Sequence, residues 1–152
     1  MSSESPTPDS VTVRSRVLEL LDEFHGRIDR GVSIADLLDE NATFTTPVRN
    51  ALGREAFSNL MLSLFKMRQD KGRTARHIGA NVNIEDLGSG QFRVRSLIVV
   101  LAADSGAGSQ GFLNVGDHVD IVKMDPSGTC RFMERTMTPV LQFALTPSVG
   151  GP

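Results

Sequence analysis

Three histidines are the residues of this chain best suited to move protons: His25, His77 and His118. The ordinary pKa of histidine lies near neutrality, so a well-placed imidazole transfers protons without a cofactor. The sequence contains no tyrosine and no tryptophan, which removes the phenol that many small proton-transfer sites use to stabilise an oxyanion. Acid–base chemistry in this protein would therefore fall on histidines and carboxylates.

Metal and nucleotide chemistry have little support in the spacing of the residues. The histidines are dispersed and the single cysteine, Cys130, stands apart from them, so the short ligand spacings of zinc sites are absent. A metal would need Asp29, His77 and His118 to converge, and we predict neither a metal nor a cofactor. Residues 106–111 match the pattern G-x-G-x-x-G, but a strand rather than a helix is expected after them, so we interpret them as a hairpin loop and candidate lid.

Length, charge and hydropathy indicate a single domain without a nucleic-acid or membrane partner. A chain of 152 residues can bury one ordinary core, and a net charge of −2 offers no basic surplus for binding nucleic acid. The longest apolar run, residues 97–103, is far shorter than the ~20 residues that a membrane-spanning helix needs. The polar segment 1–9 has no signal-peptide pattern and the lone cysteine fits a reducing compartment, so a cytoplasmic location is expected.

The elements that must position the chemical groups follow from hydrophobic periodicity and turn residues. We expect flexible tails at residues 1–10 and 146–152, with one domain at residues 11–145 between them. Ser33 and Asp36 form a capping box at the start of a short helix. The three expected helices are residues 11–30, 33–38 and 53–71. The expected strands are residues 42–46, 74–86, 91–104, 111–124 and 129–143.

Helices first and a long antiparallel sheet afterwards indicate an α+β domain, in which the sheet curls around the helices. Both alternating faces of residues 96–102 are apolar, so both sides of the sheet are expected to be covered at that strand. One face would meet the helices and an internal cavity. We expect the other face to meet a second copy of the chain, which predicts a homodimer.

Several short motifs occur in an order that is typical of one family. They are a helix end, a short helix with the strand after it, the start of the next helix, a histidine-bearing strand and two final strands. These motifs are residues 27–31, 34–44, 53–57, 74–79, 116–120 and 130–135. In this order they resemble the SnoaL-like branch of the NTF2-like superfamily over residues 13–143. The resemblance implies a cone, in which three N-terminal helices pack in a curved antiparallel sheet.

The resemblance also implies a pair of catalytic residues in a pocket. Asp29 and His77 match the aspartate of the first helix and the strand histidine of the scytalone dehydratase-like members. A carboxylate bonded to one imidazole nitrogen fixes the tautomer and leaves the other nitrogen free to take and return a proton. This chain departs from those members, because His118 stands where a tyrosine is common, Cys130 where a tryptophan is common, and Ala102 where a second histidine would fall. A direct copy of scytalone dehydration is therefore not expected.

Five further residues are candidates for binding substrate. His118 and Asp120 share one face of a strand, and Arg135 on the next strand can reach Asp120. These residues either line the cavity or form a structural ion pair on the outer face, and the frequency of ion pairs between neighbouring strands favours the second interpretation. Phe65 lies on the apolar stripe of the third expected helix, and Met133 shares the strand parity of Arg135.

The resemblance leaves the activity open, because the superfamily includes dehydratases, polyketide cyclases, ketosteroid isomerase relatives, epoxide hydrolases and dioxygenase small subunits. Our leading hypothesis is a cofactor-independent proton-transfer enzyme of secondary metabolism, a cyclase, isomerase or dehydratase that acts on a hydrophobic polyketide- or steroid-like molecule. Asp29 would orient His77 as general base and then acid. The alternative is a non-catalytic ligand-binding or partner protein, such as the small subunit of an aromatic-ring hydroxylating dioxygenase. An epoxide hydrolase is a weaker alternative, because it would need two carboxylates in the pocket. His25, one helical turn before Asp29, is expected to form an exposed pair with Asp29.

Overall fold

The computed structural model describes residues 9–106 and 109–145. Most of both expected tails, residues 1–10 and 146–152, lies outside the described residues, as do two residues of the expected lid loop. The described part contains α1 (Ser10–Arg30), η1 (Ala35–Leu37), β1 (Leu38–Thr45), β2 (Asn50–Leu52), α2 (Arg54–Asp70), β3 (Arg73–Gly88), β4 (Gln91–Asp104), β5 (Gly111–Met124) and β6 (Cys130–Leu145). No helix in these described ranges combines the length and the hydropathy needed to span a membrane.

Helix α1 has well-defined caps at both ends. Asp9 is the N-cap, and its carboxylate accepts the backbone N–H groups of Val11 and Thr12 at 3.0 and 2.9 Å. Ser10 is thus the first helical residue and not the end of a tail. The helix ends at Gly31, whose φ of +68° is the left-handed conformation that glycine adopts without strain. The predicted extent of this helix is confirmed to within one residue.

The second expected helix is a single 3₁₀ turn, η1, so the described chain has two α-helices and not three. The capping box fails because Asp36 uses its carboxylate elsewhere: both oxygens bind the guanidinium of Arg27, at 2.5 and 3.2 Å. Ser33 accepts one backbone N–H, that of Ala35, at 3.3 Å. With one amide capped and Leu38 already the first residue of β1, the helix has no room to extend.

The sheet is mixed, whereas an antiparallel sheet was expected. Its strand order is β2-β1-β6-β5-β4-β3, and the meander from β3 to β6 is antiparallel as predicted. The meander returns to the first strand of the chain, and β6 pairs with β1 in parallel. Parallel neighbours need a long crossover, which α2 and the meander provide. The short strand β2 was not expected from the sequence, and it pairs with β1 at the sheet edge.

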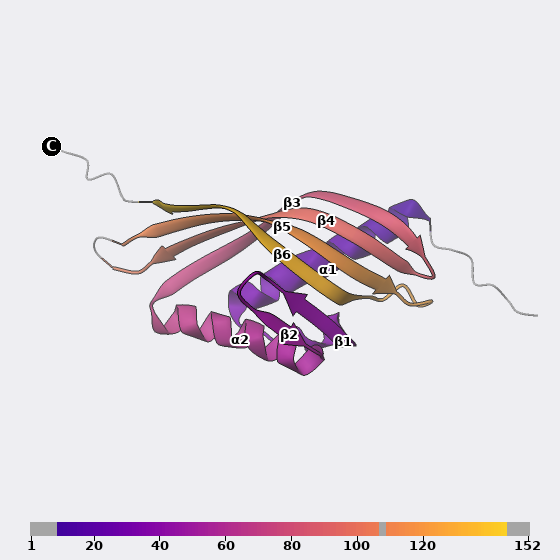
Figure 1. Cartoon of the computed structure of the whole chain (residues 1–152), viewed down its shortest axis with the longest axis horizontal. Coiled ribbons are helices and arrows are strands. Elements are labelled where there is room, and N and C mark those ends of the chain that lie inside the picture. Colours follow the sequence, from indigo (N-terminus) through magenta and orange to yellow (C-terminus); the bar gives the residue numbers. More distant parts are fainter. Residues whose placement is uncertain (1–8, 107–108, 146–152) are drawn as a thin grey trace, which may run out of the picture.

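The curved sheet and the two helices enclose the core between them. Figure 1 shows α1 running across one face of the sheet, and α2 packs against α1, β1 and β3. Side chains on alternate positions of each strand point to this face. The largest fully buried apolar side chains are Val17, Ile34, Leu38, Phe57, Val94, Val122 and Phe132. The helix-filled, curved sheet is the cone that the resemblance implied, built with one α-helix fewer.

The outer face of the sheet carries an apolar patch with exposed residues from β3, β4 and β6. Ile78, Leu101, Leu141 and Phe143 are each between 43% and 50% exposed. The pairing of the strands forms rows of neighbouring residues that run across the sheet from β3 to β6. Ile78 and Leu141 are the two ends of one such row, and Leu101 and Phe143 lie in the adjacent row on the same face. The apolar outer side of β4 therefore continues across the meander. A homodimer through this face stays a prediction.

Candidate active site

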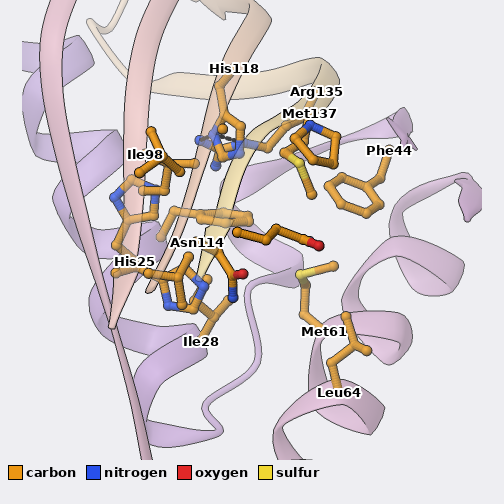
Figure 2. Close-up of a pocket in the computed structure, with 17 residues that line it drawn as sticks. His25, Ile28, Phe44, Met61, Leu64, Ile98, Asn114, His118, Arg135 and Met137 are labelled. Atoms are coloured by element: carbon orange, nitrogen blue, oxygen red, sulfur yellow. Dashed lines mark hydrogen bonds between the residues drawn. The ribbon is translucent and has the colours of Figure 1, made fainter. Parts of the chain in front are cut away.

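A cavity of about 240 Å³ lies between the helices and the inner face of the sheet, with walls from α1, α2, β1 and β3 to β6 (Figure 2). Most of the wall is apolar. Its larger apolar side chains are Phe24, Ile28, Phe44, Met61, Ile98 and Met137. Its polar side chains are His25, His77, Asn114, His118, Arg135 and Gln142. All three histidines of the sequence therefore line one cavity.

Asp29, in the last turn of α1, holds His77, which lies on β3 and lines the cavity. Asp29 Oδ1 lies 2.6 Å from His77 Nδ1, and Oδ2 accepts the backbone N–H of His77 at 3.0 Å. The side chain of Asp29 is 10% exposed and that of His77 is 14% exposed. The structure thus brings the two residues together, and their catalytic role stays a prediction.

Asp29 determines which nitrogen of His77 carries the proton. Burial raises the pKa of Asp29, but hydrogen bonds from the side chain and backbone of His77, with the positive charges of a protonated His77 and of Arg76, lower it by more, so the net shift is downward. An ionised carboxylate only accepts hydrogen bonds. His77 therefore donates from Nδ1, and in the neutral form of the ring Nε2 has the lone pair that a general base needs.

His118, on β5, has a different partner. It is buried and lines the same cavity. Its Nδ1 lies 2.6 Å from Nη2 and 3.2 Å from Nε of Arg135, on β6. A guanidinium only donates hydrogen bonds, so Nδ1 is the acceptor and the proton of the neutral ring is on Nε2. Burial, together with the charge of Arg135, lowers the pKa of His118 and keeps the ring neutral.

Arg135 lies at the centre of a buried polar cluster. Its guanidinium carbon lies 4.3 Å from the ring centre of Phe24 and 4.9 Å from that of Phe132, within cation–π range. Its Nε lies 3.2 Å from Oδ1 of Asp120, and both residues are fully buried. Burial raises the pKa of Asp120 to about 6, against the opposing charge of Arg135. The pair thus lies inside the cone and not on the outer face; Arg135 lines the cavity, whereas Asp120 does not.

His25 is buried, which contradicts the expected exposed pair with Asp29. Its ring stacks on that of His77, with centres 6.1 Å apart and planes 11° from parallel, and lies 6.4 Å from the ring of His118. Burial, with positive charge on neighbouring groups, lowers the pKa of His25 to about 3. The helical period could have revealed this position, because His25 lies three residues before Ile28 and belongs to the buried stripe of α1.

Phe65, predicted to bind substrate, does not line the cavity. It lies on α2 and packs at the end of α1, where a β-carbon built on Gly31 would be 2.4 Å from its ring. This glycine therefore permits the close approach of the two helices. Met61, one helical turn earlier on α2, and Leu64, the residue before Phe65, face the cavity instead.

Met133, also predicted to bind substrate, lies outside the cavity wall because of a β-bulge. Phe132 and Glu134, on either side of it, pair with consecutive residues of β5. The extra residue breaks the alternation of side chains along β6. Arg135 and Met137, which follow the bulge, line the cavity, and Met133 does not.

The structure offers no cluster of metal ligands in residues 9–106 and 109–145: no group of three or more histidine, cysteine, aspartate or glutamate side chains could hold a metal ion. Nδ1 of His77 is hydrogen-bonded to Asp29, and Nδ1 of His118 is hydrogen-bonded to Arg135. The three residues considered for a metal therefore have other partners.

The buried histidines predict loss of stability in acid. Because the pKa of His25 falls from 6.5 to about 3 on folding, the unfolded chain binds a proton between these pH values that the folded chain does not. The contribution of His25 to the free energy of unfolding is complete above pH 6.5 and is lost as the pH falls. The contribution of His118 changes in the same direction. The pKa of Asp120 rises from 3.8 to about 6 on folding, so the folded chain binds a proton there that the unfolded chain does not. This proton offsets the contribution of one of the two histidines. We expect the free energy of unfolding to fall by about 1.4 kcal/mol per pH unit between roughly pH 6 and 4.

Urea unfolding followed by circular dichroism at several pH values measures this slope. His25→Phe removes one of the two histidine contributions and should bring the slope between pH 6 and 4 close to zero. A variant with the slope of the wild type would show that His25 is not a neutral buried group in the folded protein.

Comparisons with known proteins place this geometry in a known fold. Neither the protein-family models nor the curated proteins contain a match to the sequence. A solved Novosphingobium aromaticivorans protein assigned as a scytalone dehydratase matches at 15% identity over 93% of this chain and 96% of its own, with a TM-score of 0.76. An NTF2-like protein from the same species matches at 19% identity, covering 86% and 83%, with a TM-score of 0.71. ActVI-ORFA from Streptomyces coelicolor matches at 17% identity, covering 84% and 97%, with a TM-score of 0.64.

At these identities the similarity shows the fold: the chain has the NTF2-like cone, as the short motifs indicated. The same fold supports many activities. The function must therefore be argued from the cavity and its side chains.

Proposed function

We propose that the protein is a cofactor-independent proton-transfer enzyme, a cyclase, isomerase or dehydratase, that acts on a small hydrophobic substrate in this cavity. One observation carries the proposal: Asp29 holds Nδ1 of His77 at 2.6 Å, and His77 lines an apolar cavity. An oriented imidazole in a site of low polarity is a general base that needs no metal and no cofactor.

The size of the cavity limits the substrate. An apolar cavity of about 150 Å³ holds benzene, so a cavity of about 240 Å³ suits a single ring with substituents or a compact bicyclic molecule. A steroid- or polyketide-sized substrate would have to place its reacting ring inside and extend beyond the cavity. We favour the smaller class.

The proposed chemistry is proton abstraction followed by proton return or by loss of a leaving group. His77 takes a proton from a carbon of the substrate at Nε2, and Asp29 stabilises the imidazolium that forms. The imidazolium then returns the proton to another carbon, which is isomerisation, or to a departing oxygen, which is dehydration. The assigned name of one structural neighbour, scytalone dehydratase, is in keeping with the second outcome.

Hydrogen exchange tests this function without knowledge of the natural substrate. Small ketones such as 2-indanone and phenylacetone are first tested for binding by changes in the protein's NMR spectrum. Exchange of their α-protons in D₂O is then followed for the wild type and for His77→Asn, which keeps an N–H near the position of Nδ1 for Asp29 but lacks Nε2. We expect the variant to lose 10²-fold or more of the catalysed rate.

Free imidazole at the concentration of the protein's histidines serves as the control for non-specific catalysis. A ketone that binds but exchanges at the buffer rate with the wild type would contradict the proposed proton transfer. That result would support the non-catalytic ligand-binding alternative.

A further inference from the structure

We propose that His118 donates a hydrogen bond from Nε2 to an oxygen of the substrate, so that the substrates of this site are carbonyl compounds that lose a proton from the carbon next to the carbonyl group. This inference deepens the proposed function, because it depends on His77 as the base. It assigns the second chemical group of the reaction and the class of substrate.

His118 has a hydrogen-bond partner that fixes its tautomer. Two nitrogens of Arg135, at 2.6 and 3.2 Å, converge on Nδ1. Because both can only donate, the lone pair of Nδ1 is used inside the protein and the ring proton must be on Nε2. Arg135 itself is held in place by two aromatic rings and by Asp120, so this tautomer is fixed by a rigid partner.

His77 differs from His118 in the group that holds its ring. A carboxylate holds His77 at Nδ1 and leaves a lone pair on Nε2, whereas a guanidinium holds His118 at Nδ1 and leaves a proton on Nε2. Both residues line one cavity, and the ring of His25 packs against both of them. The cavity therefore offers a proton acceptor and a neutral hydrogen-bond donor from two side chains of the same type.

Removal of a proton from the carbon next to a carbonyl group uses both a base and a hydrogen-bond donor. His77 Nε2 forms a bond to the α-proton as the carbon–hydrogen bond breaks. The electron pair of that bond becomes the carbon–carbon double bond, and the π pair of the carbonyl group moves to its oxygen. His118 gives a hydrogen bond, not a proton, to this developing enolate, which removes the need for the tyrosine that the sequence lacks. The proton then leaves His77 for carbon or for a leaving group.

Arg135 adds charge at the same place. Its Nη1 is buried and has no hydrogen-bond partner among the described residues, and Arg135 lines the cavity beside His118. A positive group close to the enolate oxygen stabilises the negative charge in an environment of low polarity. Arg135 thus acts as the positioning residue for His118 and as an electrostatic contributor.

Nitrogen NMR of the protein labelled with ¹⁵N-histidine tests the tautomers directly. The chain has three histidines, so three rings are observed. We expect His77 to carry its proton on Nδ1 and His118 to carry its proton on Nε2, and His118→Asn and His77→Asn assign the signals. A proton on Nδ1 of His118 in the folded protein would overturn the proposal.

Binding of phenols tests the contact with an oxyanion, since a phenolate resembles an enolate. The visible absorption of 4-nitrophenolate, in a range where the protein does not absorb, reports its binding. We expect His118→Asn, which keeps an acceptor for Arg135 but lacks Nε2, to bind 4-nitrophenolate about ten- to hundredfold more weakly than the wild type. His118→Gln restores an N–H near the position of Nε2 and should recover part of the loss.

Variants of His77 and His118 distinguish the proposed proton transfer by His77 from the proposed hydrogen bond of His118 to substrate. His77→Asn should abolish α-proton exchange and keep phenolate binding, whereas His118→Asn should weaken phenolate binding and also slow exchange. Equal phenolate binding by wild type and a folded His118→Asn variant would refute the role of His118. Phenolate binding that depends on His118, without any α-proton exchange by the wild type, would keep the ligand contact and refute the proposed enzyme.

Discussion

Asp29→Asn is expected to slow proton abstraction by about 10²- to 10⁴-fold without unfolding the protein. Two donors of His77, Nδ1 at 2.6 Å and the backbone N–H at 3.0 Å, converge on the two oxygens of Asp29. A carboxylate accepts both bonds. An amide accepts at one oxygen and turns its NH₂ group toward the other donor, so His77 is driven to move its proton to Nε2. The base then has no lone pair facing the cavity.

The measurement is the rate of α-proton exchange in D₂O, together with the ¹⁵N signals of His77. The matched control is Asp36→Asn, which makes the same chemical change in a carboxylate that binds Arg27 and does not line the cavity. It should leave exchange unaltered. If Asp29→Asn exchanges protons as fast as the wild type, Asp29 does not orient a catalytic base.

Local sequence signals predicted most of the secondary structure, since each depends on a few neighbouring residues. The apolar stripe of α1 and the glycine at its end fixed that helix, and the glycine-rich turns separated the strands of the meander. The failures are cases in which a distant partner competes with a local one. Asp36 binds Arg27 and not the backbone N–H groups of η1. Strand β6 pairs in parallel with β1, the first strand of the sequence, which is far from it along the chain.

The direction of a side chain was harder to predict than its element. Strand alternation shows which residues share a face, but the face that is inside depends on register and bulges. The bulge at Met133 is invisible in the sequence, so Met133 could not be separated from Arg135. The asymmetry between His77 and His118 depends on contacts with Asp29 and Arg135, which lie 48 and 17 residues away.

Arg135→Met is expected to lower the free energy of unfolding by about 3–5 kcal/mol at pH 7. The substitution keeps much of the volume between Phe24 and Phe132 but removes the positive charge beside Asp120, a carboxylate with no exposed surface. It also leaves Nδ1 of His118 without a donor. A buried charge that loses its partner is strongly unfavourable, whereas an apolar pair of similar size is tolerated.

A double-mutant cycle isolates the charge pair. Asp120→Leu with Arg135→Met should be less destabilised than the sum of the two single variants, because neither charge remains. The loss in Arg135→Met should also shrink as the pH falls from 7 to 5. Without Arg135 the pKa of Asp120 rises above about 6, so protonation removes the unpaired charge in the folded state.

The control for this cycle is Arg131→Met on the same strand, whose partner Asp125 lies 3.6 Å away at the surface. Such an exposed pair contributes about 0–1 kcal/mol. Urea unfolding followed by circular dichroism reports all four variants, since the chain has no tryptophan for fluorescence. Strict additivity of the two single substitutions would show that Asp120 and Arg135 do not stabilise each other.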